Sequence, residues 1–198
     1  MLEHDLLGLL RNTAYTYQCG LDRGEDSFMP MEQTLSVLND LVREGVLLNY
    51  AIGGAIAATF YIEPVATYDL AVFVSVPVLP SGLLLLSPIY GALKTRGFEA
   101  EGEYVHISGI PVQFLPAYNA LVEEALADAR DIAVGAVSTR IIRAEHLMAI
   151  MLETGRGKDL ARLAQMIEES EFDMAVLQGL IDRHGLRRKW DGFRQLPA

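Results

Sequence analysis

The first quarter of the chain combines a short apolar run with a longer amphipathic segment. Residues 2–11 predict an opening helix, and the polar, glycine-bearing residues 18–27 predict a loop. Pro30 stands where a first helical turn accepts proline, and Gly45 marks the end of the same helix. Between these two residues, apolar side chains recur at the spacing of one helix face: Leu35, Leu38, Leu41 and Val42.

The middle of the chain alternates between strand and helix patterns. Helices are predicted over 55–61, 84–96 and 117–129. Gly109 separates two short apolar runs that suit a hairpin. The predicted strands cover 46–52, 70–76, 104–108, 111–115 and one or two segments of 132–142.

From residue 144 onward the pattern is helical. A mixed sheet flanked by helices, with a C-terminal helical lobe, is the simplest α/β architecture that fits this order. No linker is long enough to separate independent domains. We expect an α/β domain over 1–142 with the lobe, 143–198, packed on it, or one single domain. The lobe's predicted helices are 144–153, 158–168, 173–183 and a short one around Trp190.

One uncharged run, residues 70–93, has the length of a membrane span. Pro77, Pro80 and Pro88 interrupt this run. Proline breaks a helix that in lipid must satisfy all of its own backbone groups. We therefore expect a buried strand, a loop and a helix here, and no membrane partner.

The charge and cysteine content narrow the classes of function. A formal net charge of -10 disfavours broad binding to nucleic acid, which depends on clustered Lys and Arg. Cys19 is the only cysteine, so an intrachain disulfide and a cysteine-based metal cluster are excluded. The acidic start, Met1 to Asp5, lacks the basic residues of a signal peptide. We expect a cytoplasmic protein.

Several short elements follow one another in a recognisable order. Gly53-Gly54 precede a predicted helix, and Thr67-Tyr68-Asp69-Leu70 lie on a predicted strand. Further elements follow downstream: Gly97-Phe98, Gly109-Ile110-Pro111-Val112 with Leu115-Pro116, Arg143-Ala144-Glu145-His146-Leu147 and Arg156-Gly157-Lys158-Asp159. In this order, over residues 47–167, the chain resembles the nucleotidyltransferase superfamily, especially AbiEii-like toxins and their uncharacterised bacterial relatives.

The resemblance implies a nucleotide site that binds ATP or another nucleoside triphosphate. It assigns Gly53 and Gly54 to a turn that lets the backbone approach the phosphates, next to a helix start with free N–H groups. It implies Thr67 and Lys158 as further nucleotide-binding residues. In the superfamily, two acids two residues apart on the strand of Asp69, and a third from a neighbouring strand, hold two Mg²⁺ ions that position and neutralise the phosphates.

This sequence departs from that pattern at the metal-binding positions. Asp69 remains as the residual catalytic and metal-binding candidate, but Ala71 stands two residues later and Gln113 occupies the position of the third acid. A single carboxylate is too few for two hard dications. Mg²⁺ is the cofactor that the resemblance suggests, the donor set argues against it, and folding is expected to need none.

Structural explanations stand beside the functional ones. Gly53-Gly54 suit an ordinary tight turn, and Asp69 can cap a strand end or pair with an arginine. Lys158 suits a solvated first helical turn. His146, among apolar neighbours in its helix, suits a buried structural histidine.

Three hypotheses stay open. The first is a nucleotidyltransferase-fold protein with little or no catalysis that binds a nucleotide or a protein partner. The second is an active Mg²⁺-dependent enzyme that moves an NMP group to a protein, tRNA or small acceptor, with Glu101 or Glu103 helping Asp69; these two acids also suit a solvated strand face. The third is a toxin-antitoxin component or a homo-oligomer, suggested by a mean hydropathy of +0.23.

Overall fold

The computed structural model describes residues 29–63, 67–76 and 86–195. Within them, one mixed sheet has the strand order β3-β4-β5-β2-β1-β7-β6. Its strands are β1 (Asn49–Ile52), β2 (Leu70–Ser75), β3 (Ala100–Glu101), β4 (Tyr104–Ile107), β5 (Ile110–Pro116), β6 (Arg130–Val134) and β7 (Val137–Ile141). β2 is parallel to β5 and β1 to β7, whereas the other neighbours are antiparallel.

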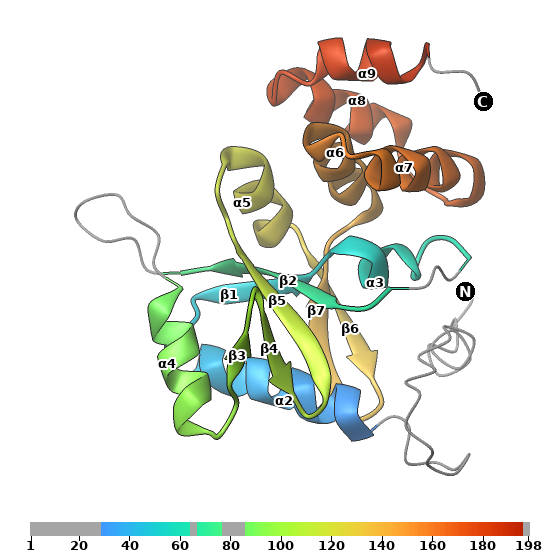
Figure 1. Cartoon of the computed structure of the whole chain (residues 1–198). Coiled ribbons are helices and arrows are strands. Elements are labelled where there is room, and N and C mark those ends of the chain that lie inside the picture. Colours follow the sequence, from blue (N-terminus) through green and yellow to red (C-terminus); the bar gives the residue numbers. More distant parts are fainter. Residues whose placement is uncertain (1–28, 64–66, 77–85, 196–198) are drawn as a thin grey trace.

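Helices cover both faces of the sheet (Figure 1). α2 (Met29–Arg43) and α4 (Ser87–Thr95) lie on one face, and α3 (Gly54–Ala58) and α5 (Ala120–Ala127) lie on the other. The predicted α/β class with a C-terminal helical lobe is therefore confirmed. The lobe lies beyond α3 and α5 and consists of α6 (Ala144–Thr154), α7 (Gly157–Glu169), α8 (Met174–Arg183) and α9 (Arg187–Phe193).

The predicted face of α2 is buried against the sheet. Leu35, Leu38 and Leu41 are fully buried, and Gly45 has a positive φ of 75° just after the helix. The amides of residues 46 and 47 both donate to the carbonyl oxygen of Leu41. These bonds close the end of the helix, and β1 therefore starts at residue 49 instead of the predicted 46.

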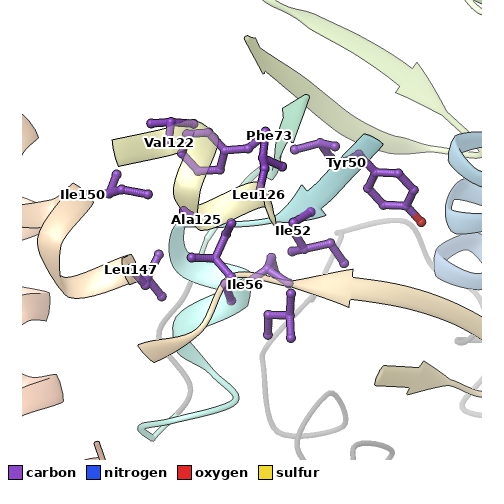
Figure 2. Close-up of a cluster of buried hydrophobic side chains, with 14 of the residues drawn as sticks. Tyr50, Ile52, Ile56, Phe73, Val122, Ala125, Leu126, Leu147 and Ile150 are labelled. Carbon is purple, nitrogen blue, oxygen red and sulfur yellow. The ribbon is translucent and has the colours of Figure 1, made fainter. Parts of the chain in front are cut away.

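The core lies between the sheet and its two helical layers. Figure 2 shows Phe73 of β2 beside Val122 of α5, with Ile150 of α6 nearby, on the face that carries the lobe. Tyr50 points the other way, toward α2, where its hydroxyl donates to Asn39 Oδ1 at 2.8 Å. The apolar run of β2 is therefore a central strand covered on both faces, as predicted.

α6 is the central helix of the lobe. Eight of its eleven residues are buried, and it contacts α3, α5, α7, α8 and α9. His146 belongs to its buried set and is 3% exposed, which agrees with the structural explanation of this histidine.

Some predicted elements lie outside the described residues: the opening helix over 2–11, the loop over 18–27, and the start of the predicted 84–96 helix. Among the described residues, none of the helices is both long and apolar enough to cross a membrane. The structure adds one short strand that was not predicted, β3 at Ala100–Glu101, which pairs with β4.

Candidate functional site

The Gly53-Gly54 turn joins β1 to α3, where the sequence predicts it. The Gly53 amide donates to the carbonyl oxygen of Ala71 at 2.9 Å, and a Cβ on Gly53 would stand only 2.3 Å from the Phe73 ring. Gly54 has a positive φ of 60°, and a Cβ on it would stand 2.9 Å from Cβ of Ala71. Packing alone therefore requires both glycines, whatever the turn binds.

α3 is shorter than the sequence suggests. It ends at residue 58 instead of 61, and the Thr59 hydroxyl donates to the carbonyl oxygen of Ile56 at 2.7 Å within the closing turn. A helix of five residues aligns few peptide dipoles. Little of the positive charge needed by a bound phosphate can come from this helix.

Asp69, predicted to lie on a strand, instead comes directly before β2 and is half-buried. It lies at the same end of the sheet as the Gly53-Gly54 turn, because β1 and β2 pair antiparallel with Ile52 opposite Val72. Thr67 Oγ1 lies 3.4 Å from Asp69 Oδ1 and 3.5 Å from the Asp69 carbonyl oxygen. Both distances are long for hydrogen bonds between oxygens. The contact gives Thr67 a local partner in Asp69, and its nucleotide-binding role stays a prediction.

The two positions expected to complete the metal site lie side by side. In the parallel pair β2–β5, Ala71 is the register partner of Gln113. Neighbouring strands are about 4.8 Å apart, and register partners point to the same face of a sheet. The Ala71 Cβ also lies beneath Gly54. Beside Asp69, this face of the sheet thus presents a methyl group and an amide.

An acid does reach this face from the β3–β4 turn. Glu103 Oε2 accepts a hydrogen bond from Gln113 Nε2 at 2.5 Å. Burial raises the pKa of the Tyr104 hydroxyl, and the negative charges of Asp69 and Glu103 raise it further. Glu101, the other acid considered from the sequence, lies on the exposed edge, 3.6 Å from His106 Nε2.

Next to Tyr104 lies a second aromatic side chain, Tyr68. The two rings meet edge to face, with centroids 6.0 Å apart and an interplanar angle of 80°. Tyr68 is 60% exposed. The exposed Tyr68 ring, packed against the half-buried Tyr104, offers a surface beside Asp69 on which a planar ring can pack.

The turn between α6 and α7 carries the charged residues of the motif at 156–159. Arg156 Nε and one terminal nitrogen lie 2.6 and 3.3 Å from the two carboxylate oxygens of Asp159. Asp159 is 4% exposed. Hydrogen bonding to Asp159 raises the pKa of Arg156, and the negative charge of Asp69 raises it further. Lys158 is exposed, and no hydrogen bond joins it to the described part of the chain.

Arg162, Tyr118 and Glu153 also belong to this region, and sequence reasoning missed all three. Burial lowers the pKa of Arg162, against the negative charges of Asp159 and Asp69. Burial and the Glu153 carboxylate raise the pKa of Tyr118 to about 12. One available signal was the helical spacing of Arg162, three residues after Asp159.

The donors at Asp69 do not fit a pair of magnesium ions. Around Asp69, Ala71 offers no ligand atom, and the Gln113 side-chain amide donates to Glu103. Across residues 29–63, 67–76 and 86–195, no group of three or more His, Cys, Asp or Glu side chains is arranged to hold a metal ion. Magnesium prefers several anionic oxygens in near-octahedral geometry.

No protein-family model matches the chain, and no curated protein matches it. Its structure is similar to that of an antigenic nucleotidyltransferase-like protein from Paracoccidioides brasiliensis, at 13% identity and a TM-score of 0.47, over 71% of this chain and 76% of that one. It is also similar to ANT(2")-Ia in complex with adenylyl-2"-tobramycin, at 14% identity and a TM-score of 0.46, over 79% of this chain and 98% of that one.

A solution structure of the antibiotic-resistance factor ANT(2'')-Ia is likewise similar, at 14% identity and a TM-score of 0.49, over 83% of this chain and 95% of that one.

Proposed function

We propose that this chain binds a nucleoside triphosphate between the Asp69 end of the sheet and the α6–α7 turn, with little or no nucleotidyl transfer. The observation that carries the proposal is the register pairing of Ala71 with Gln113 on the face that Gly54 covers. The resemblance expects two further carboxylates at these positions, converging on Asp69. Because a methyl group and an amide occupy these positions, the metal ions that would act on the phosphates lack two carboxylate ligands.

Features suited to a nucleotide surround the same place. Gly54 is only half-buried at the start of α3, and Tyr68 exposes an aromatic side chain on which a base could pack. Arg156 brings a guanidinium group to the α6–α7 turn, where it is hydrogen-bonded to Asp159. Hydrogen-bond donors are therefore available to bind a nucleotide, whereas no group among the described residues is available to activate nucleotidyl transfer.

A second candidate is an active transferase that uses Glu103, because the Glu103 carboxylate is already hydrogen-bonded to Gln113. Release of that bond would free a second carboxylate beside Gln113. Glu103 is exposed, which disfavours this candidate, because water screens the charge of an exposed carboxylate.

The first test measures binding and transfer separately. Purified protein with labelled ATP, GTP, CTP or UTP and Mg²⁺ is expected to bind a nucleotide by calorimetry and to label neither itself nor bulk tRNA. Robust transfer that Asp69→Ala abolishes and Glu103→Gln lowers would establish the transferase instead. Absence of binding for all four nucleotides would contradict both candidates.

The second test rebuilds the metal site with the double variant Ala71→Asp and Gln113→Asp. We expect tighter Mn²⁺ binding by calorimetry and a lower melting temperature in metal-free buffer, because close carboxylates repel one another until a cation binds. The matched control, Ala120→Asp with Gln195→Asp, makes the same two changes at exposed positions. Equal Mn²⁺ affinity in the two folded variants would show that positions 71 and 113 do not converge on Asp69.

The AbiEii-like subfamily and a toxin-antitoxin role remain proposals from the sequence resemblance. Three apolar side chains are exposed and could contact a protein partner: Leu48 (59%), Met174 (45%) and Val176 (42%). Affinity capture of a co-expressed neighbouring gene product, with size-exclusion chromatography of the complex, tests this role.

A further inference from the structure

The helical lobe carries an apolar groove between α7 and α9. Both helices pack on α6 (Figure 1). The groove between them has a volume of about 580 Å³. Its apolar lining includes Leu160, Ala161, Ala164 and Ile167 from α7 and Trp190 and Phe193 from α9. A concave surface with this lining can bury the apolar side chains of another segment.

The wall that α7 contributes suits a short helix. Its lining residues recur three and four positions apart from Gly157 to Glu168, which is the spacing of one helix face. At 1.5 Å per residue this wall is about 16 Å long. Ala161 is exposed and Ala164 is half-buried, and both side chains are small, so the axis of a second helix can come close. Grooves of this kind bind amphipathic helices through apolar residues at the same spacing.

Residues 2–10 of this chain have the pattern of such a helix. They lie outside the described residues, and their sequence predicts a helix. Leu2, Leu6, Leu9 and Leu10 recur at the spacing of one apolar helix face. Over residues 2–10 a helix is about 12 Å long, which fits within the wall of α7.

The charges of the segment and of the groove are complementary. Glu3 and Asp5 make the start of the segment acidic, and Arg11 follows it. The lining of the groove includes one exposed charge of each sign, Arg194 and Glu168. A segment with acids at one end and an arginine at the other can meet both, and such pairs at the rim of an interface favour one orientation of docking.

The length of the connecting chain allows the segment to reach the groove. Residues 11–28 join the segment to α2, and a chain of this length spans up to about 60 Å when it is extended. A compact domain of this size is only about 40 Å across. The tether therefore permits binding within one chain, which makes the contact intramolecular.

We propose that residues 2–10 bind as a helix in the α7–α9 groove of their own chain, with the leucine face against the apolar lining. This contact would cover Trp190 and Phe193 from the side that the described residues leave open. The proposal does not depend on nucleotide binding.

The first experiment changes the leucine face in the full chain and follows Trp190, the single tryptophan, by fluorescence. Leu6→Ser with Leu9→Ser should shift the emission to longer wavelength, because Trp190 lines the groove that the segment leaves. Leu7→Ser, at a leucine outside the Leu2-Leu6-Leu9-Leu10 face, is the matched control and should leave the emission unchanged. A synthetic peptide of residues 1–12 should reverse the shift of the double variant in a saturable titration.

The second experiment changes the groove. Ala161→Glu places a carboxylate at an exposed position of the lining and should lower the melting temperature of the wild-type chain. In the Leu6→Ser, Leu9→Ser background the same change should have little effect, because the contact is already lost. Ala120→Glu, at an exposed position of α5 outside the groove, is the matched control and should have the same effect in both backgrounds.

Three results would overturn the proposal. Additive effects of Ala161→Glu and the leucine variants on the melting temperature would show that the segment and the groove do not meet. An unchanged Trp190 emission in the leucine variant, without a response to the peptide, would leave the groove to a different protein. A wild-type dimer that the leucine variant converts to a monomer, by size-exclusion chromatography, would place the segment in the groove of a second copy.

Discussion

At the scale of single residues, the turn at Gly53 is the position where packing leaves least freedom. Gly53→Ala would place a methyl group 2.3 Å from the Phe73 ring, which is 5% exposed and enclosed by core side chains. Because the ring has little room to move, we expect the free energy of unfolding to fall by about 1–3 kcal/mol. Urea denaturation at pH 7 measures the change.

Gly91→Ala is the matched control for that substitution. Gly91 lies in α4, exposed, and a Cβ on it would meet nothing within 4 Å. Alanine favours helix over glycine, so this variant should be more stable than the wild type by about 0.5–1 kcal/mol. If both variants were destabilised equally, the contact between Gly53 and Phe73 would not be the reason.

At the scale of elements, one acidic side chain ties α5 to the end of α8. Glu124 accepts hydrogen bonds from Arg183, at 2.5 and 3.2 Å, and pairs with His184 Nε2 at 2.7 Å. Hydrogen bonding to Arg183, aided by His184 and opposed by partial burial, lowers the pKa of Glu124 to about 2. The folded pKa thus lies below the ordinary value of 4.5.

The direction of this shift predicts the acid response. The stabilisation from Glu124 is fully present above pH 4.5 and is lost as the pH falls toward 2. Arg183→Gln should lower the melting temperature at pH 7 and flatten its fall across that window, as measured by thermal melts from pH 7 to 2. An unchanged slope in Arg183→Gln would show that the pair does not couple the helices.

As the pH falls, the contribution of His146 to stability is lost at a higher pH than that of Glu124. Burial lowers its pKa, more than Asp128 and Glu124 raise it, so folding favours the neutral ring. Its contribution is present above pH 6.5 and declines as the pH falls below that value. Because the two pH ranges differ, one series of thermal melts distinguishes the effect of His146 from that of Glu124.

At the scale of the whole molecule, the sheet and the helical lobe share α6. Because α6 contacts α3 and α5 as well as α7, α8 and α9, we expect both parts to unfold in one transition. Trp190 is the single tryptophan and is buried in α9, so its fluorescence reports on the lobe, whereas far-UV circular dichroism reports on all elements. The two urea curves should coincide.

Two separate transitions would instead support the division at residue 142. In that case the fluorescence midpoint would differ from the midpoint of circular dichroism, and a chain ending at residue 142 should keep the signal of the sheet. Under the single-domain expectation that truncated chain does not fold, because the apolar surfaces of α3 and α5 lose the cover of α6.

The local pattern of the sequence determined most elements of this fold. The spacing of Leu35, Leu38 and Leu41 defined the buried face of α2, and Gly109 marked the hairpin of β4 and β5. These features depend on residues close together in the chain, where periodicity and turn chemistry act directly. The boundaries of the elements were predicted less accurately. β1 starts three residues later than predicted, because the amides of residues 46 and 47 close the end of α2.

The tertiary structure alone decided how the candidate site is arranged. The sequence identified Asp69, Ala71 and Gln113, but only the parallel register of β2 and β5 sets Ala71 beside Gln113. The bond from Gln113 to Glu103 was likewise beyond reach, because it depends on packing among separate elements. A linear pattern records which residues are present, whereas long-range pairing decides which charges meet and which stay without a partner.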